Sequence, residues 1–195
     1  SAIAQARERL GEVPLKRLYN EMVAPIATEK TTGAYHRGWL LVSLDGSTLD
    51  VGDTAENERA FGRPGVSRGD GSAFPKMRFC SLLENGTHVL FGAVPGPYAI
   101  GETTLARDVI THLRLGMLCL ADRNFFSYDL WGAASQTGAD LLWRVKKNML
   151  LPCLERLPDG SYLSLLYGST KDRRHKRGGI TGRVVEYRLS GGNGT

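Results

Sequence analysis

Two short apolar runs, each followed directly by an aspartate, constrain the fold of this chain more than any other feature. The first run covers residues 39–44 and leads into Asp45, and the second covers residues 117–121 and leads into Asp122. Compact apolar runs bounded by turn residues are typical of buried strands. If the two strands are parallel neighbours, their aspartates lie at the same end of a sheet. We therefore predict an α/β fold with Asp45 and Asp122 at adjacent strand ends.

The segments around these runs predict further elements in a definite order. Asn85-Gly86 is a strong hairpin signal and lies between two strand-like runs. Apolar spacing predicts helices, and the capping residue Ser127 and Gly138 bound one of them. The order from the first strand is strand, strand, strand, helix, strand, helix, strand, as in an RNase-H-like mixed sheet flanked by helices. The expected strands cover residues 39–44, 76–83, 87–94, 117–121 and 141–146. The expected helices cover residues 15–26, 105–113 and 127–136. Residues 52–73 are expected to form a long loop, and residues 95–101 are expected to break the sheet.

The chain divides into three predicted parts. Residues 1–37 form an N-terminal helical segment, and residues 38–147 form a partial RNase-H-like catalytic core. Residues 148–195 begin a β-rich insertion subdomain. Within this last part we expect a hairpin from residues 150–157 and 162–166, a basic loop over residues 171–177, and a strand over residues 183–189.

The two aspartates have a metal-binding and an ordinary interpretation. Neighbouring strands lie about 4.8 Å apart, so carboxylates at matching ends can share one divalent cation. Hard oxygen ligands of this kind suit the Mg²⁺ or Mn²⁺ ions that support phosphoryl transfer. Against this, Asp-Gly after a strand is usually a turn, and Asp-Arg is often a surface ion pair. The placement of both residues in this strand order favours a catalytic, metal-binding pair, whereas Asp50 and Asp53 are expected in a solvated loop.

Several motifs resemble those of bacterial insertion-sequence DDE transposases of the IS-four group. Leu44-Asp45-Gly46-Ser47-Thr48-Leu49-Asp50-Val51 is similar to their first-Asp motif, and Leu120-Ala121-Asp122-Arg123-Asn124-Phe125-Phe126 is similar to their second. The stretches at residues 101–106 and 140–146 also resemble the family, and the likeness extends over roughly residues 5–190. It implies metal-dependent strand cleavage and strand transfer at transposon ends.

One element of the family pattern has no counterpart in this sequence. The third carboxylate of these enzymes is a Glu on a late helix, among Tyr, Arg and Lys, and nothing here matches that pattern. Glu186 lies in a strand-like run, and Glu102 opens a helix, where its charge suits the helix dipole; neither is assigned to catalysis. We therefore expect a fragment that binds Mg²⁺ or Mn²⁺ weakly and cleaves DNA poorly. The alternative is a catalytically inactive remnant that only binds DNA or dimerises.

Charge supports a polyanionic partner. The formal net charge is +5, and double-stranded DNA, as transposon ends and target, is the expected partner. Arg144 and Lys146 alternate with apolar residues and are expected on one exposed strand face. The alternative interpretation of the basic cluster at residues 171–177 is a solvent-exposed loop that does not bind DNA. The candidate DNA-binding residues are Arg123, Arg144, Lys146, Arg173, Arg174, Lys176 and Arg177.

Other classes of site have little support. The three cysteines are widely spaced without a CxxC pair, and the four histidines are scattered, so a zinc site is not expected. No phosphate-binding loop or dinucleotide fingerprint occurs. The sequence shows no membrane-length apolar run and no signal peptide, so we expect a cytoplasmic protein without a membrane partner. A homodimer of the parent protein is compatible with the resemblance.

Overall fold

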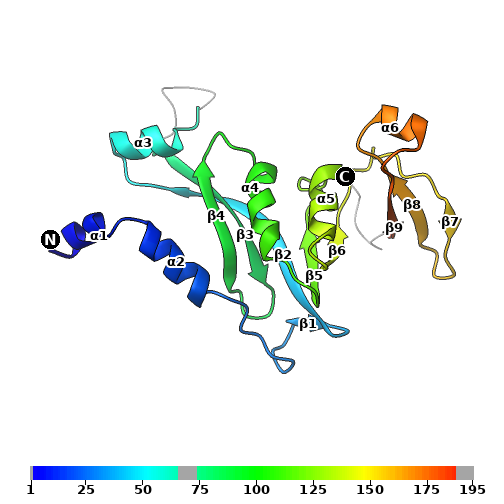
Figure 1. Cartoon of the computed structure of the whole chain (residues 1–195), viewed down its shortest axis with the longest axis horizontal. Coiled ribbons are helices and arrows are strands. Elements are labelled where there is room, and N and C mark those ends of the chain that lie inside the picture. The colour runs from blue at the N-terminus through cyan, green and yellow to red at the C-terminus, as the bar shows by residue number, and fades with distance from the viewer. Residues whose placement is uncertain (1, 66–73, 188–195) are drawn as a thin grey trace, which may run out of the picture.

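The computed structural model describes residues 2–65 and 74–187 and contains two sheets (Figure 1). The larger has six strands, with the order β4-β3-β2-β5-β6 and with β1 paired to β2. Its strands are β1 (Tyr35–His36), β2 (Trp39–Asp50), β3 (Lys76–Glu84), β4 (Leu90–Pro97), β5 (Met117–Ala121) and β6 (Asp140–Trp143). The sheet is mixed, because β2, β5 and β6 run parallel whereas β1, β3 and β4 pair in antiparallel fashion.

Two helices cover one face of this sheet. They are α4 (Glu102–Val109), which continues into the 3-10 turn η1 (Ile110–His112), and α5 (Tyr128–Ser135). Figure 1 shows α4 in front of the β3 and β4 side and α5 in front of β5 and β6. The RNase-H-like mixed sheet expected from the sequence is confirmed.

The core forms between the helices and alternate residues of the central strands. Leu40, Val42 and Leu44 of β2 are buried, as are Cys119 and Ala121 of β5. Side chains alternate across a strand, so these residues share one face and their neighbours point to the other. The apolar side chains of α4 complete the core from above the sheet; they are Leu105, Ala106 and Val109.

Element ends follow local chemistry. The Ser127 side chain accepts a hydrogen bond from the amide of Leu130 at 3.2 Å and caps α5, as predicted. Gly116 and Gly138, which precede β5 and β6, have φ angles of 87° and 81°, a region that favours glycine. The connection over residues 52–65 contains α3 (Ala55–Phe61), whereas a long loop was expected over residues 52–73.

The N-terminal segment is joined to the core through a buried carboxylate. Helices α1 (Ala2–Leu10) and α2 (Val13–Met22) contain no buried residue. Glu84, at the end of β3, is fully buried, and its carboxylate accepts hydrogen bonds from the amides of Ile26 at 3.3 Å and Ala27 at 3.0 Å. The Thr87 hydroxyl donates a further bond. Glu84 therefore holds the residues that follow α2 against the sheet.

A second, three-stranded sheet lies beyond α5 and β6 (Figure 1). It has the order β7-β8-β9 and is antiparallel. Its strands are β7 (Glu155–Arg156), β8 (Tyr162–Leu166) and β9 (Ile180–Val184), with α6 (Thr170–His175) between the last two. The expected strand over residues 183–189 is wrong in its bounds: β9 begins at Ile180 and ends at Val184, so residues 185–187 are not in a strand, and residues 188–189 lie outside the described part of the chain.

Candidate metal and DNA site

Asp45 lies in β2, and Asp122 directly follows the neighbouring parallel strand β5. The ladder between β2 and β5 ends with the pair Leu44 and Ala121, so the next residue on each strand is an aspartate. Neighbouring strands are separated by about 4.8 Å. Leu44 and Ala121 point into the core, so the two aspartates point to the other face, where both are exposed. The predicted placement on adjacent strands is confirmed.

The expectation that Asp45 closes its strand is wrong. β2 continues to Asp50 because its second half pairs with β3, from Asp45 opposite Ser81 to Asp50 opposite Lys76. The Asp45-Gly46 sequence resembles a turn, but pairing with the hairpin strand β3 keeps it extended. Asp45 therefore lies where β2 parts from β5 and remains fixed by β3. Asp50 belongs to this strand rather than to a loop and forms an ion pair with Lys76.

Each aspartate has a defined polar neighbour. The Gly46 amide donates to Oδ1 of Asp45 at 2.8 Å. Nη1 of Arg144 lies 3.4 Å from Oδ1 of Asp122, and the side chains of this ion pair are 70% and 47% exposed. Such exposed pairs contribute little to stability. Both carboxylates are therefore open to solvent and available to a cation.

Aromatic packing supports the turn that carries Asp122. Phe125 is buried, and its amide donates to the Asp122 carbonyl at 3.0 Å. The ring of Trp131 lies 5.6 Å from that of Phe126 and 5.4 Å from that of Trp143, centroid to centroid. Trp143 is buried and Trp131 packs against the core. Both side chains therefore serve packing rather than base stacking.

The donor set fits a hard divalent cation. Two neighbouring carboxylates provide oxygen ligands of the kind that Mg²⁺ and Mn²⁺ prefer. Within residues 2–65 and 74–187, no group of three or more His, Cys, Asp or Glu side chains is arranged to hold a metal ion. The pair alone thus leaves most positions around an ion to water or to other ligands. Metal binding by Asp45 and Asp122 stays a prediction.

Basic side chains adjoin the two aspartates. Arg123 is exposed in the turn that follows Asp122. Arg144 and Lys146 are also exposed, but β6 ends at Trp143, so they follow the strand instead of lying within it as expected. The Arg144 amide still donates to the Ala121 carbonyl at 2.9 Å, which holds this residue beside the end of β5. Arg144 is therefore fixed close to Asp122 by its backbone as well as by its side chain.

The later basic cluster is a helix and not the expected loop. Residues 171–175 of it belong to α6, whose N-cap residue Ser169 accepts from the Asp172 amide at 3.1 Å, and Lys176 and Arg177 follow the helix. Arg173 donates from Nη2 to the Leu150 carbonyl at 2.9 Å, so this guanidinium already has a partner. The remaining candidates are exposed; they are Arg174, Lys176 and Arg177. The capping residue explains the difference, because a Ser followed three residues later by an acidic residue starts a helix.

The two glutamates not assigned to catalysis, Glu102 and Glu186, occupy different surroundings. Glu186 follows β9 and accepts a hydrogen bond from the hydroxyl of Tyr162, in β8, at 3.2 Å. Glu102 lies at the start of α4 with its side chain against Gly46, on the face of β2 that α4 covers, whereas Asp45 points to the other face. The periodicity of the sequence does not indicate the contact between Glu102 and Gly46. The one sequence feature consistent with it is a glycine directly after an aspartate in a strand-like run.

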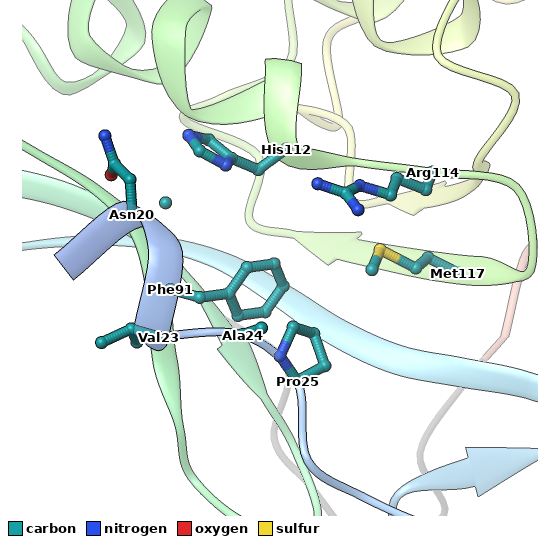
Figure 2. A pocket seen from close by; sticks show the side chains of 9 residues that line it. Asn20, Val23, Ala24, Pro25, Phe91, His112, Arg114 and Met117 are labelled. Atoms are coloured by element: carbon teal, nitrogen blue, oxygen red, sulfur yellow. The ribbon is translucent and has the colours of Figure 1, made fainter. Parts of the chain in front are cut away.

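A concave region elsewhere does not include these residues. Figure 2 shows it between the end of α2 and the start of β5, where Asn20, Phe91, His112, Arg114 and Met117 contribute to its lining. Met117 opens β5 and Asp122 follows its end, so this region lies at the opposite end of the strand.

Comparison with a family model identifies a match over residues 39–188, to the family described as "Transposase DDE domain". The match starts at the first residue of β2 and covers both aspartates, Arg144 and the second sheet. It includes well over half of the chain. None of the helices in the described ranges has the length and hydropathy of a membrane-spanning segment.

Two curated proteins of Escherichia coli K12 are similar in sequence. A protein named "Putative transposase InsZ" is 30% identical over 143 residues, which is 73% of this chain and 48% of that protein. "Transposase InsG for insertion sequence element IS4" is 28% identical over 176 residues, which is 89% of this chain and 39% of that protein. The chain therefore spans less than half the length of each relative.

A solved structure is also similar. It is a piggyBac transposase synaptic complex with hairpin DNA, with a TM-score of 0.41 and 12% sequence identity. The match covers 64% of this chain and 30% of that one.

Proposed function

Because this chain belongs to the family of bacterial insertion-sequence transposases with a DDE domain, we propose that it carries the metal-binding and DNA-binding centre of a transposase. The observation that supports this role is the placement of Asp45 and Asp122 on adjacent parallel strands, one residue beyond the last pair of their ladder. Each of the two lies in a motif that resembles one of the family's aspartate motifs. The proposed activity is cleavage and strand transfer at transposon ends in a larger protein.

The expected roles follow from the chemistry of the residues. Asp45 and Asp122 would hold a divalent cation, Mg²⁺ or Mn²⁺, which supplies activation of an attacking hydroxyl and stabilisation of the leaving oxygen. Arg144 stands beside Asp122 and would neutralise a DNA phosphate next to the cation. Arg123 and Lys146 extend the same positive surface. The proposed partner is double-stranded DNA, and the proposed site of action is the cytoplasm.

The proposal is tested by locating Mn²⁺ on the chain. Mn²⁺ is titrated into ¹⁵N-labelled protein, and the broadening of amide signals identifies the residues near the ion. We expect the signals of residues 45–46 and 122 to broaden first. Asp45→Asn and Asp122→Asn should each raise the Mn²⁺ concentration needed by roughly tenfold or more, since each removes a charged ligand.

A matched control and a contrary result complete this test. Asp129→Asn changes an exposed aspartate in the first turn of α5 and should leave the titration unchanged. Broadening that is unaffected by both Asp45→Asn and Asp122→Asn would show that these residues do not bind the cation. If such a protein still bound duplex DNA, it would fit the alternative of a DNA-binding module without metal chemistry.

A further inference from the structure

One row of polar residues crosses the main sheet at the level of the two aspartates. Asp45 of β2 lies directly opposite Ser81 of β3 in the antiparallel ladder. On the other side of β2, the parallel registers place Asp122 beside Asp45, and Arg144 beside Asp122. The order across four neighbouring strands is therefore Ser81, Asp45, Asp122 and Arg144. Ser81 ends this row on the side away from Arg144.

Ser81 and Asp45 point to the same face of the sheet. Cys80 and Leu82, the neighbours of Ser81 on β3, are fully buried in the core that α4 helps to form, and so is Leu44, the neighbour of Asp45. Side chains alternate across a strand, so Ser81 and Asp45 both point to the opposite face. The β-carbons of directly opposite residues in an antiparallel pair lie about 4.5–5.5 Å apart. The Ser81 hydroxyl is therefore a neighbour of the Asp45 carboxylate.

The Ser81 side chain is buried and yet has no polar partner. The residue is only 3% exposed, and its hydroxyl forms no hydrogen bond within the described part of the chain. The other residues on this face of β3 are apolar, namely Met77, Phe79 and Leu83. A hydroxyl that is removed from water without a partner costs free energy. This hydroxyl is therefore available to a ligand that binds beside Asp45.

We propose that Ser81 is a positioning residue of the cation site and forms a hydrogen bond with a water molecule of the hydrated Mg²⁺ or Mn²⁺ held by Asp45 and Asp122. This inference rests on the proposed function. Ser81 lies one strand spacing, about 4.8 Å, beyond Asp45 on the side away from Asp122. Direct coordination, at about 2.1 Å, of an ion shared by the two aspartates is out of its reach, whereas a coordinated water can bridge the gap. Mg²⁺ retains several waters in proteins, and outer-shell hydrogen bonds hold its ligands in place.

The experiment extends the Mn²⁺ titration to three substitutions of Ser81. Threonine and valine have nearly the same shape, so Ser81→Thr and Ser81→Val disturb packing alike and differ in the hydroxyl. Loss of an outer-shell partner weakens metal binding by about 10- to 100-fold, and we expect Ser81→Val to bind Mn²⁺ about tenfold more weakly than Ser81→Thr. Ser81→Ala removes the hydroxyl without added bulk and should bind about tenfold more weakly than the unmodified chain.

Ser164 offers a matched control. It is fully buried in β8, in the second sheet, and its hydroxyl also lacks a hydrogen-bond partner among the described residues. Ser164→Ala should therefore leave the Mn²⁺ affinity unchanged. The position of the ion gives a second readout in the unmodified chain. The amide signal of Ser81 should broaden together with those of residues 45–46 and 122, whereas that of Ser164 should stay sharp.

The outcomes separate this inference from the proposed function. Thermal unfolding is measured for every variant, and all titrations are made well below the lowest midpoint. A purely structural role of Ser81 would lower the midpoints and leave the Mn²⁺ affinities of Ser81→Thr and Ser81→Val equal, which would overturn the inference. Loss of affinity in Asp45→Asn and Asp122→Asn, with Ser81→Ala unchanged, would overturn the inference alone. Unchanged affinity in both aspartate variants, or no Mn²⁺ binding by the unmodified chain, would overturn it together with the metal site.

Discussion

Asp122 and Asp45 show how far single residues can be interpreted from sequence. β5 has the predicted bounds because an apolar run between Gly116 and Asp122 has no other favourable arrangement than a buried strand. Asp45 was placed correctly beside β5, but its strand continues past it. That continuation depends on pairing with β3, a contact distant in sequence. Gly46 and Glu102 meet for the same reason, so their proximity could not be inferred from sequence.

At the same scale, the three cysteines should differ sharply in reactivity. Cys80 and Cys119 are buried, and burial is the main cause that raises the pKa of each thiol from 9.0 to about 12. Cys153 is exposed. The thiolate is the reactive form of cysteine. A disulfide reagent at pH 8 should therefore modify Cys153 quickly in the native protein, and all three thiols after denaturation. Equal rates for three thiols in the native state would contradict the buried placement.

The same pKa values fix the sign of a pH effect on stability. The folded-state pKa of Cys80 and Cys119 lies above the ordinary value of 9.0. The unfolded chain therefore ionises first, and the stability associated with the neutral thiols is complete below pH 9 and is lost as the pH rises toward 12. Chemical denaturation of Cys119→Ala and the unmodified chain between pH 8 and 10.5 tests this. The unmodified chain should lose more stability over that range, and parallel curves would show that the thiol is not responsible.

At the scale of elements, the sequence was informative where the pattern is local. The hairpin at Asn85-Gly86, the capped helix α5 and the strand β5 appear where predicted. β6 is shorter than expected, because only residues up to Trp143 pair with β5. The alternation of exposed and less exposed residues continues to Lys146 and therefore suggests a longer strand than the pairing allows. β4 extends through Pro95 and Pro97, which lie on an edge strand where a missing amide is tolerated.

Glu84 gives a prediction at this scale. Its two carboxylate oxygens accept from the amides of Ile26 and Ala27, whereas glutamine would offer only one acceptor oxygen and would direct an amino group toward the second amide. Glu84→Gln should therefore lower the free energy of unfolding by about 1–3 kcal/mol, the cost of leaving a buried polar group unsatisfied. Urea denaturation measures the loss. The exposed control Glu56→Gln should change stability by less than about 0.5 kcal/mol.

A second measurement shows whether the lost stability concerns the N-terminal segment. Helices α1 and α2 bury no residue, so the hydrogen bonds at residues 26–27 are a main attachment of this segment. Limited proteolysis should cut Glu84→Gln faster near residues 23–30 than the unmodified chain. Equal rates and an equal urea midpoint would show that the buried carboxylate does not anchor this segment.

On the scale of the whole molecule, the second sheet lies beside the edge of the first that carries Arg144 (Figure 1). The Tyr128 hydroxyl, on α5, donates to the Gly178 carbonyl, just after α6. Arg173 of α6 donates to the Leu150 carbonyl, in the connection that follows β6. These two contacts hold α6 and the exposed basic residues in it and directly after it in place relative to the main sheet. A duplex bound at Arg144 and Lys146 could therefore also contact Arg174, Lys176 and Arg177.

The salt dependence of DNA binding tests this arrangement. Each phosphate contact with duplex DNA contributes about −0.9 to the slope of log K against log salt concentration. Arg144→Ala with Lys146→Ala should weaken binding to any duplex and flatten the slope by about two units, with little change in sequence preference, because phosphate contacts position DNA without specifying it. Replacing Arg174, Lys176 and Arg177 should flatten it by up to about three units, since Arg174 lies in the capped helix α6 and the amide of Arg177, just after the helix, donates to the Asp172 carbonyl. If one duplex covers both groups, the combined variant should lose the sum of the two effects.

The control and the contrary results follow from the same geometry. Arg7 and Lys16 are exposed on α1 and α2, at the other end of the molecule in Figure 1, and replacing both with Ala should leave the slope unchanged. If this control variant flattened the salt slope equally, the slope would report the overall charge of the protein rather than contacts with a defined DNA-binding surface. An unchanged slope for the Arg144 and Lys146 double variant would remove the main sheet from the DNA-binding surface. A flatter slope for the Arg144 and Lys146 double variant, with no change when Arg174, Lys176 and Arg177 are replaced, would confine the duplex to the sheet edge beside Asp122. Phosphates bound by those three residues would otherwise release counterions of their own.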